Sequence, residues 1–295
     1  MQSFPWSKLG YMPERLCTFE GRNINFSQNS SDSPNGILFL HGVTRNWRTF
    51  YPLFSELNNE CQLTAIDFRG HGKSERTPGS YLVTDYIKDA SAVLKESRSS
   101  RQFIYGHSLG AMVALAAAAG TGKQVAGIIL EDPPFSTMGA RINGSQLHRF
   151  FIGLSECLGQ KSSAELLFQK LSNIPLNRKE EKTLLIKDLR DEMSRWFSAE
   201  SLMHIDSEVL DPIVKGQWLD GYELQKLARK VSCPVLLLQA DQAVGGMLTD
   251  ADVNLLKKSV VSELRCIQFS GVDHSIHINK PNDIIQLIRK EISGN

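Results

Sequence analysis

Short apolar runs alternate along this chain with longer stretches in which apolar residues recur every three or four positions. The runs have the length and residue types of strands that are buried on both faces, and they occupy residues 36–42, 61–67, 102–108, 126–132, 233–241 and 264–271. The helical periodicity falls at residues 47–57, 86–97, directly after 108, at 248–259 and at 282–292. We therefore expect an α/β fold with a mostly parallel sheet and helices on both of its faces. Residues 15–29 alternate instead like an antiparallel hairpin that turns at Gly21.

One long segment interrupts this rhythm. Residues 135–229 contain no convincing strand pattern, but they hold several charged amphipathic helical stretches, such as "AELLFQKLSNIPLNRKEEKTLLIKDLRDEMSRWF". Helices inserted between two strands of a parallel sheet predict a cap at residues 135–230, on a core formed by residues 1–134 and 231–295. The large residues expected on the apolar face of this cap are Phe150, Phe151, Met193, Trp196, Phe197, Met203 and Trp218.

The bulk composition limits the classes of partner. The chain has 295 residues, 41% of them hydrophobic, which suits one large domain or a core with an inserted subdomain. Its formal net charge of +1 indicates neither a nucleic acid nor an acidic membrane as partner. No apolar stretch reaches the roughly 20 residues of a membrane-spanning helix, and the first residues show no signal-peptide core. We expect a small-molecule substrate, and the sequence gives no sign of the oligomeric state.

The cysteines carry no framework of their own. Their total is odd, no two form a C-x-x-C pair, and they lie far apart, at Cys17, Cys61, Cys157, Cys233 and Cys266. This spacing suits neither a disulfide scaffold nor a metal site. We therefore expect free, mostly buried thiols in a cytoplasmic protein, and a Gram-negative periplasm is also compatible with them.

The stretch "QFIYGHSLGAMVALAAAAG" places a serine between two glycines where strand formers give way to helix formers. A turn this tight brings two backbones together, so side chains at positions 106 and 110 would collide and glycine removes them. Ser108 at the apex is then expected in a strained conformation with its hydroxyl exposed, at the start of a helix. This is the position of a nucleophile.

Other strand ends carry matching chemistry. Ligands of an open parallel sheet bind outside the carboxyl ends of its strands, and there the chain has "HGV" at 41–43, "EDPPF" at 131–135 and "GVDHSIH" at 271–277. A serine nucleophile needs a general base. His274 and His277, both just past the last strand, are the candidates.

Taken together, these residues resemble the alpha/beta-hydrolase family. The blocks "LFLHG", "DFRGHGKS", "YGHSLGAMVAL", "ILEDPP" and "FSGVDHSIHINKP" follow the family's order and cover most of the chain outside the cap. The resemblance implies a serine hydrolase with a helical cap, with His274 as the base and His277 as a structural residue. Asp273 stands where relatives frequently have glycine.

The resemblance leaves two positions for the acid of the triad. Many members carry it after the strand that precedes the histidine, where "LLLQADQAVGGM" has Ala243 in register and Asp241 out of register. Some members, among them amidohydrolases of N-heterocycle breakdown, carry it one strand earlier in the chain, after the strand at 126–132, where this chain has Asp132. We favour Asp132 and keep Asp241 as the alternative.

The remaining site residues also follow from the resemblance. It implies an oxyanion hole made by the backbone N–H groups of Val43 and Leu109, with Gly42 allowing a close approach. His41 is expected to pack or hydrogen-bond rather than to act as a base, and Arg69 and His71 are expected to shape a loop. The residues expected to border the substrate pocket are Gly42, His107, Trp47 and Phe135, and His107 is also expected to pack or hydrogen-bond rather than to act as a base.

The expected reaction is hydrolysis of a carboxylic ester or related acyl bond through an acyl-enzyme. Hydrolysis of an amide or of a carbon–carbon bond in a catabolic pathway is an alternative, and so is a non-catalytic ligand-binding protein with a hydrolase fold. Serine at position 108 argues against halide-releasing and epoxide-opening relatives, which use an aspartate nucleophile. The scheme requires no metal and no organic cofactor.

Overall fold

The computed structural model describes residues 12–121, 125–158, 163–179 and 182–294. Its main sheet has eight strands in the order β1-β2-β4-β3-β5-β6-β9-β10. The strands are β1 (Glu14–Phe19), β2 (Arg22–Gln28), β3 (Asn35–Leu40), β4 (Gln62–Ile66), β5 (Arg101–His107), β6 (Val125–Glu131), β9 (Val235–Ala240) and β10 (Leu264–Phe269). The strands from β4 to β10 are parallel, whereas β1 pairs with β2 and β2 with β4 in antiparallel register. The predicted α/β fold is confirmed, and the first hairpin turns at Gly21, whose φ is +81°.

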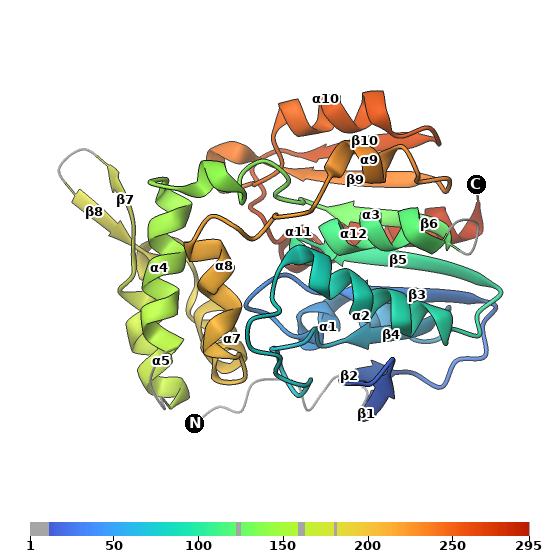
Figure 1. The fold of residues 1–295 in the computed structure, drawn as a ribbon, viewed down its shortest axis with the longest axis horizontal. Helices are drawn as coiled ribbons and strands as arrows, with labels where there is room; N and C mark the ends of the chain where they lie inside the picture. The colour runs from blue at the N-terminus through green and yellow to red at the C-terminus, as the bar shows by residue number, and fades with distance from the viewer. Residues whose placement is uncertain (1–11, 122–124, 159–162, 180–181, 295) are drawn as a thin grey trace.

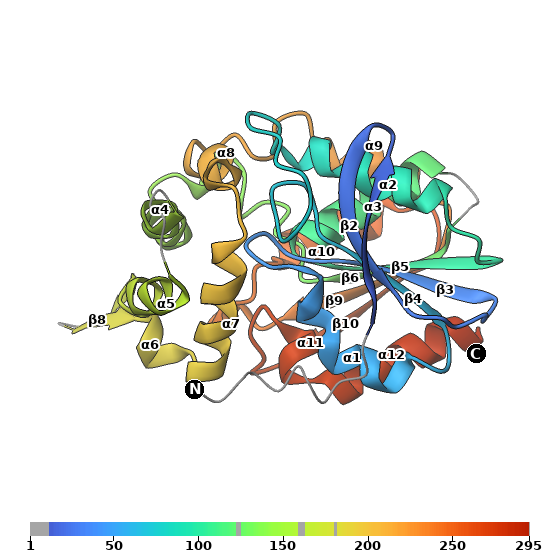
Figure 2. The ribbon, with the colours of Figure 1, turned by 90° about the horizontal axis from the view of Figure 1, so that it is seen from below.

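Helices cover both faces of this sheet (Figures 1 and 2). The helical segments that lie on the sheet are η2 (Trp47–Phe50), α1 (Tyr51–Leu57), α2 (Val83–Lys95), α3 (Leu109–Thr121), α9 (Leu224–Ala228), η6 (Gln242–Val244), α10 (Asp250–Ser259), α11 (Ile276–Asn279) and α12 (Pro281–Ser293). Figure 2 shows α1, α11 and α12 on one face, with α2, α3 and α9 on the other. The predicted helices therefore all occur, with ends that differ by a few residues.

Two apolar clusters account for this layering. Because strand side chains alternate between faces, Ile37 and Phe39 of β3 enter the cluster under α1 and α12, whereas Leu38 and Leu40 enter the cluster under α2 and α3. Both clusters are nearly free of solvent. Helix α3 is buried along most of its length, which explains why its sequence is apolar on all sides.

Residues 140–214, which lie between β6 and β9, form a separate group of elements beside the sheet, at the left of Figure 1. These elements are η4 (Ala140–Ile142), α4 (Gln146–Leu158), α5 (Ala164–Ser172), β7 (Pro175–Lys179), β8 (Lys182–Leu185), α6 (Ile186–Leu189), α7 (Glu192–Met203), η5 (Ser207–Leu210) and α8 (Asp211–Val214). Hydrogen bonds tie the group to a loop of the core: Tyr81 Oη donates to Asp206 at 2.7 Å, and the N–H of Asp206 donates to the Gly70 carbonyl at 2.8 Å. The inserted segment is thereby held against the loop that follows β4.

Two expectations about this segment are wrong. Residues 135–229 are not free of strands, because β7 and β8 pair as an antiparallel hairpin. Its strands are rich in polar residues, so no apolar alternation marked them. Met193 and Met203 do not lie on a buried face, since they are 57% and 42% exposed, whereas Phe151, Phe197 and Trp218 are buried as expected.

Other expectations concern the chemistry of the chain as a whole. No helix in the described part of the chain has the length and hydrophobicity that crossing a bilayer requires. All five cysteines are free; Cys61, Cys157 and Cys233 are buried, and Cys17 and Cys266 are partly exposed. The N-terminal expectation about a signal peptide falls on residues 1–11, which lie outside the described residues.

Candidate active site

Ser108 occupies the turn between β5 and α3 in a left-handed conformation, with φ of +55°. The glycines on either side permit this turn. A Cβ at Gly106 would lie 2.2 Å from the Gly110 carbonyl oxygen, and a Cβ at Gly110 would lie 1.9 Å from the Leu40 carbonyl oxygen. The strain at Ser108 is therefore imposed by the close packing of β3, β5 and α3.

Asp132 and His274 meet beside this turn. Asp132 follows β6 with φ of +44° and is fully buried, and its Oδ2 lies 2.6 Å from Nδ1 of His274. Three backbone N–H groups also donate to the carboxylate, those of Ala240 at 3.2 Å, Met247 at 2.7 Å and Leu248 at 3.1 Å. These donors compensate for the burial of the charge, and the carboxylate fixes Nδ1 of His274 as the protonated nitrogen.

Asp241, the alternative acid, has other partners. Its carboxylate accepts the N–H groups of Ala243 at 2.9 Å and Gly271 at 2.8 Å, and these bonds hold its pKa below the usual value. Asp241 therefore ties the end of β9 to the turn that leads to His274. The structure brings Asp132, and not Asp241, onto the imidazole.

The loop after β3 runs past Ser108. A Cβ at Gly42 would lie 3.2 Å from Cβ of Ser108, so glycine lets this backbone approach the nucleophile. Thr44 in the same loop has a φ of +68°, and Val43 between them is buried. Leu109 is the first residue of α3, and the first N–H groups of a helix have no partner within the helix. Val43 and Leu109 thus flank Ser108 from two elements.

His41 and His71 hydrogen-bond to the backbone of this loop and of the loop after β4. His41 Nε2 accepts the N–H of Phe68 at 3.0 Å, so its Nδ1 carries the proton and donates to the Gly42 carbonyl at 2.8 Å. His71 accepts the N–H of Thr44 and donates to the carbonyl of Arg69 at 2.9 Å. Burial lowers their pKa values to about 4 and about 3, so both rings are neutral at neutral pH.

His107 lies behind the site rather than on an open wall. It is 3% exposed, and its Nε2 donates to the backbone carbonyl of His274 at 3.0 Å. The two rings pack with centroids 4.6 Å apart, and burial lowers the pKa of His107 well below its usual value. A neutral His107 therefore supports the backbone of His274.

A buried network that the sequence did not predict lies next to the Asp132–His274 couple. The carboxylate of Glu131 accepts Tyr105 Oη at 2.5 Å, His277 Nδ1 at 2.8 Å and the N–H of His277 at 2.9 Å. His277 Nε2 lies 3.0 Å from Thr49 Oγ1. The sequence signal for this network is that the two adjacent acids in "ED" are followed later by the two histidines in "HSIH". These residues form two acid–histidine pairs, and only the Asp132–His274 pair lies at the candidate site.

Three of these groups have the chemistry of metal ligands. His107, Glu131 and His277 offer ligand atoms within 4.8 Å of one another, all buried. Glu131 and His277 are already engaged by the hydrogen bonds given above. Hydrogen bonding accounts for the arrangement of these two residues without a metal.

Trp47 and Phe135 are both buried. The indole of Trp47 packs against Tyr51 and stacks on Phe54, and its Nε1 donates to Glu14. These contacts belong to the core under α1, so they give no support to Trp47 as a pocket wall. Phe135 stacks on Tyr222 at 6.3 Å, and Tyr222 Oη donates to the Met112 carbonyl in α3. Phe135, at the start of the insertion, thus packs on Tyr222 near its end, and Tyr222 bonds to the helix that follows the nucleophile.

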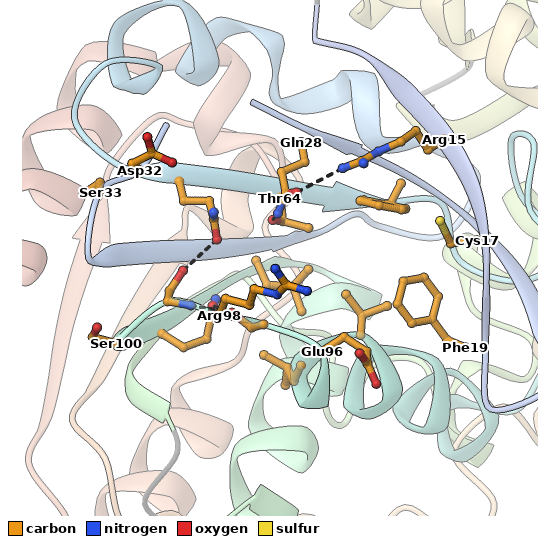
Figure 3. A pocket seen from close by; sticks show the side chains of 18 of the residues that line it. Arg15, Cys17, Phe19, Gln28, Asp32, Ser33, Thr64, Glu96, Arg98 and Ser100 are labelled. Atoms are coloured by element: carbon orange, nitrogen blue, oxygen red, sulfur yellow. Dashed lines mark hydrogen bonds between the residues drawn. The ribbon is translucent and has the colours of Figure 1, made fainter. Parts of the chain in front are cut away.

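A cavity of about 910 Å³ lies elsewhere in the molecule (Figure 3). Arg15, Asp32, Ser33, Arg98 and Ser100 are among its lining residues. It lies against β1 and β2 and against the residues that lead into β3 and β5, at the amino ends of the parallel strands. Ser108 and Asp132 follow the carboxyl ends of β5 and β6, so this cavity is separate from the candidate site.

A serine at a strand–helix turn, with an aspartate and a histidine at neighbouring strand ends, defines the class of alpha/beta hydrolases. A comparison with family models supports this conclusion: the model described as "Alpha/beta hydrolase family" matches residues 37–286. The chain belongs to that family.

Individual relatives match this chain at low identity or over only part of its length. A 2-(acetamidomethylene)succinate hydrolase of Mesorhizobium japonicum is 33% identical over 119 residues, which cover 38% of this chain and 43% of that enzyme. The chain thus spans less than half the length of this curated relative. The solved structure of N-formylmaleamic acid deformylase from Pseudomonas putida S16 has a TM-score of 0.73 at 15% identity, covering 94% of this chain and 100% of that one. Carboxylesterase CesB of Bacillus subtilis has a TM-score of 0.69 at 13% identity, covering 98% and 94%. At these identities the two structures show the fold.

Proposed function

We propose that this protein is a serine hydrolase that cleaves a carboxylic ester of a small molecule through a triad of Ser108, His274 and Asp132. The observation that carries the proposal is the 2.6 Å contact between Asp132 and His274 beside a serine in the left-handed conformation. Since Nδ1 of His274 faces Asp132, its Nε2 is the nitrogen that remains to act as a base. Ser108, Asp132 and His274 follow the carboxyl ends of three different strands, β5, β6 and β10, at the same edge of the sheet.

The reaction then follows from these positions. Ser108 Oγ attacks the carbonyl carbon while His274 Nε2 takes its proton, and the negative charge on the carbonyl oxygen is stabilised by the N–H groups of Val43 and Leu109. His274 returns the proton to the leaving alcohol, and an acyl-enzyme remains. Water activated by His274 cleaves this ester and restores Ser108. Asp132 keeps the imidazole oriented and stabilises its charged form.

Residues 135–230 act in this proposal as the cap over a core of residues 1–134 and 231–295, and α9 at the end of this segment packs against α3 and α10 of the core. The bonds from Asp206 to Tyr81 and Gly70 support this role, since they join the insertion to a loop that follows a strand at the same sheet edge. A cytoplasmic location accords with five free cysteines.

Hydrolysis of an amide is the second candidate. Asp132 lies after β6, and this location of the acid resembles that in amidohydrolases of N-heterocycle breakdown. By their names, the Mesorhizobium relative acts on an acetamido compound and the Pseudomonas neighbour on an N-formyl amide. The two candidates share one site and differ in the leaving group that His274 must protonate.

The test combines labelling with turnover. Wild-type protein and Ser108→Ala are incubated with a fluorophosphonate, and the adduct is located by mass spectrometry. We expect a single adduct on Ser108 and none in the variant. Turnover of p-nitrophenyl acetate against p-nitroacetanilide then separates ester from amide hydrolysis. Retained turnover in Ser108→Ala refutes the triad, and a protein that takes no label on Ser108 is a non-catalytic binder.

A further inference from the structure

Two arginines lie where the loop that passes Ser108 meets the inserted segment. Arg45 belongs to that loop, and its N–H donates to the Gly42 carbonyl at 3.1 Å. Its Nη1 donates to Ser198 Oγ at 2.6 Å, and its guanidinium lies 5.4 Å from the centre of the Phe197 ring, both in α7. Figure 2 shows α7 in the part of the insertion nearest the core. Arg190, between α6 and α7, places its guanidinium 5.9 Å from the ring of Phe150.

These two arginines differ from Arg69, a buried arginine of the core. Arg69 is 4% exposed and makes two hydrogen bonds with the carboxylate of Asp89, at 2.7 Å and 2.6 Å. Within the described residues, no carboxylate lies within 4.0 Å of the Arg45 or Arg190 guanidinium. Both arginines are partly buried. Burying a cation without an anionic partner is costly, so binding of an anion beside these two arginines would be favourable.

Their charges act on each other. Burial and the nearby charge of Arg190 lower the pKa of Arg45 to about 9, and burial also lowers the pKa of Arg190. Asp273 opposes both shifts, but its carboxylate is exposed and accepts the Ser275 N–H at 2.9 Å and Asn279 Nδ2 at 2.7 Å. Asp191 also opposes the shift of Arg190, but its carboxylate is exposed and accepts the N–H and the hydroxyl of Ser194. Both acids are therefore bonded elsewhere, and neither contacts an arginine directly.

The position of the two arginines connects them with the candidate site. Arg45 lies three residues after Gly42, which approaches Ser108, and Asp273 directly precedes His274. Arg45 still has unused donors, since a guanidinium offers five N–H groups and only the bond to Ser198 is described above. We propose that Arg45 and Arg190 form a carboxylate-binding subsite and that the substrate is an ester or amide that carries a free carboxylate apart from its scissile bond. This inference deepens the proposed function and rests on it.

The test compares substrates that differ only in this charge. The mono-p-nitrophenyl esters of succinate, glutarate and adipate are each compared with the same compound methylated on its free carboxylate. In the wild type we expect kcat/KM for one of the anionic esters to exceed that of its methyl ester at least about tenfold. Arg45→Gln and Arg190→Gln should each lower this ratio toward one, by about tenfold or more where the wild-type preference is large enough, as expected for loss of a hydrogen bond between charged groups, and mainly through KM.

Two controls accompany the comparison. Arg229→Gln changes an exposed arginine at the end of α9, and it should leave the ratio unchanged. Arg45→Lys and Arg190→Lys keep the charge and should restore part of the preference, which a purely structural effect would not do. Fluorophosphonate labelling of Ser108 in each variant shows that the nucleophile remains competent.

The outcomes separate the two proposals. If Ser108 is labelled and the anionic and neutral esters react equally in all variants, the carboxylate subsite is wrong and the serine hydrolase stands. If Ser108 is neither labelled nor active, the proposed function is wrong, and the carboxylate subsite is then tested by ligand binding. Glutarate, but not dimethyl glutarate, should then raise the melting temperature of the wild type and not of Arg190→Gln. Equal effects of the two compounds overturn the subsite.

Discussion

Asp132 Oδ2 and His274 Nδ1 lie 2.6 Å apart although 142 positions separate them in the chain. The turn after β6 and the turn after β10 meet because the intervening strand β9 pairs with both strands. The loop after β9 supplies two of the backbone donors that hold the carboxylate, from Met247 and Leu248. The couple is therefore built by three neighbouring strand ends.

The first prediction separates the two candidate acids. Asp132→Asn should lower kcat for a p-nitrophenyl ester on the order of 10⁴-fold, because an amide no longer fixes the protonated nitrogen of His274. Asp241→Asn should stay within about threefold of the wild type, since its carboxylate bonds to backbone and not to His274. Melting curves check that both variants fold. The opposite ranking of these two variants would assign the acid to Asp241.

A second prediction concerns the two glycines of α3. Gly110→Ala would place a Cβ 1.9 Å from the Leu40 carbonyl oxygen, whereas a Cβ at Gly120 meets nothing within 4 Å. Overpacking against backbone should cost about 3 kcal/mol or more of the free energy of unfolding. Gly120→Ala should instead be neutral or stabilising by up to about 1 kcal/mol. Urea denaturation of both variants measures this difference, and equal stabilities would contradict the tight β3–α3 contact.

The strain at Ser108 gives a third prediction. With φ of +55°, any residue with a Cβ is strained by about 1–2 kcal/mol, and glycine relieves this while losing about 0.4–1 kcal/mol of chain entropy. Ser108→Gly should therefore be more stable than Ser108→Ala by about 0.5–1 kcal/mol. Ala119→Gly, in the regular part of α3, should instead lower the free energy of unfolding, so that glycine is less stable than alanine at that position. Neither Ser108 variant should turn over substrate. A Ser108→Gly variant less stable than Ser108→Ala would show that the turn is not strained.

Local signals explain why much of this fold could be predicted. The strands of a parallel sheet are buried on both faces, so each one appears as an apolar run, and Gly106 and Gly110 mark the tight turn around Ser108. The β7–β8 hairpin was missed because its strands are polar and their pairing is held by the backbone. The pocket residues were harder still, since a buried tryptophan such as Trp47 has the same sequence pattern whether it faces the core or a ligand.

The candidate site could be predicted only in part, and for a physical reason. Ser108 is marked by the geometry of its turn, which depends on neighbouring residues. The choice between Asp132 and Asp241 depends on which strand end faces His274, and Arg45 meets α7 through residues more than 150 positions away. Such contacts between distant segments leave no periodic pattern in one sequence.

The last prediction uses the buried network around Glu131. Burial by itself raises the pKa of this carboxyl, but the nearby His277 and His107 and the hydrogen bonds from His277 and Tyr105 outweigh it and bring the pKa down from 4.5 to about 2. Since the pKa is lower in the folded state, ionised Glu131 stabilises the fold above about pH 4.5. This contribution is lost as the pH falls from 4.5 toward 2. Glu131→Gln should therefore cost about 3 kcal/mol at pH 7, and less with each step of acidification below pH 4.5.

Urea denaturation at pH 7, 5, 4 and 3 measures this dependence. Tyr105→Phe is the matched control, because it removes one donor at 2.5 Å but keeps the carboxylate and its bonds to His277. It should cost about 1 kcal/mol, and most of the acid-dependent loss of stability should remain. A Glu131→Gln variant whose deficit is as large at pH 3 as at pH 7 would show that Glu131 is not held ionised by this network. The second acid–histidine pair would then act through packing alone, whereas a shrinking deficit assigns it an electrostatic role beside the Asp132–His274 couple.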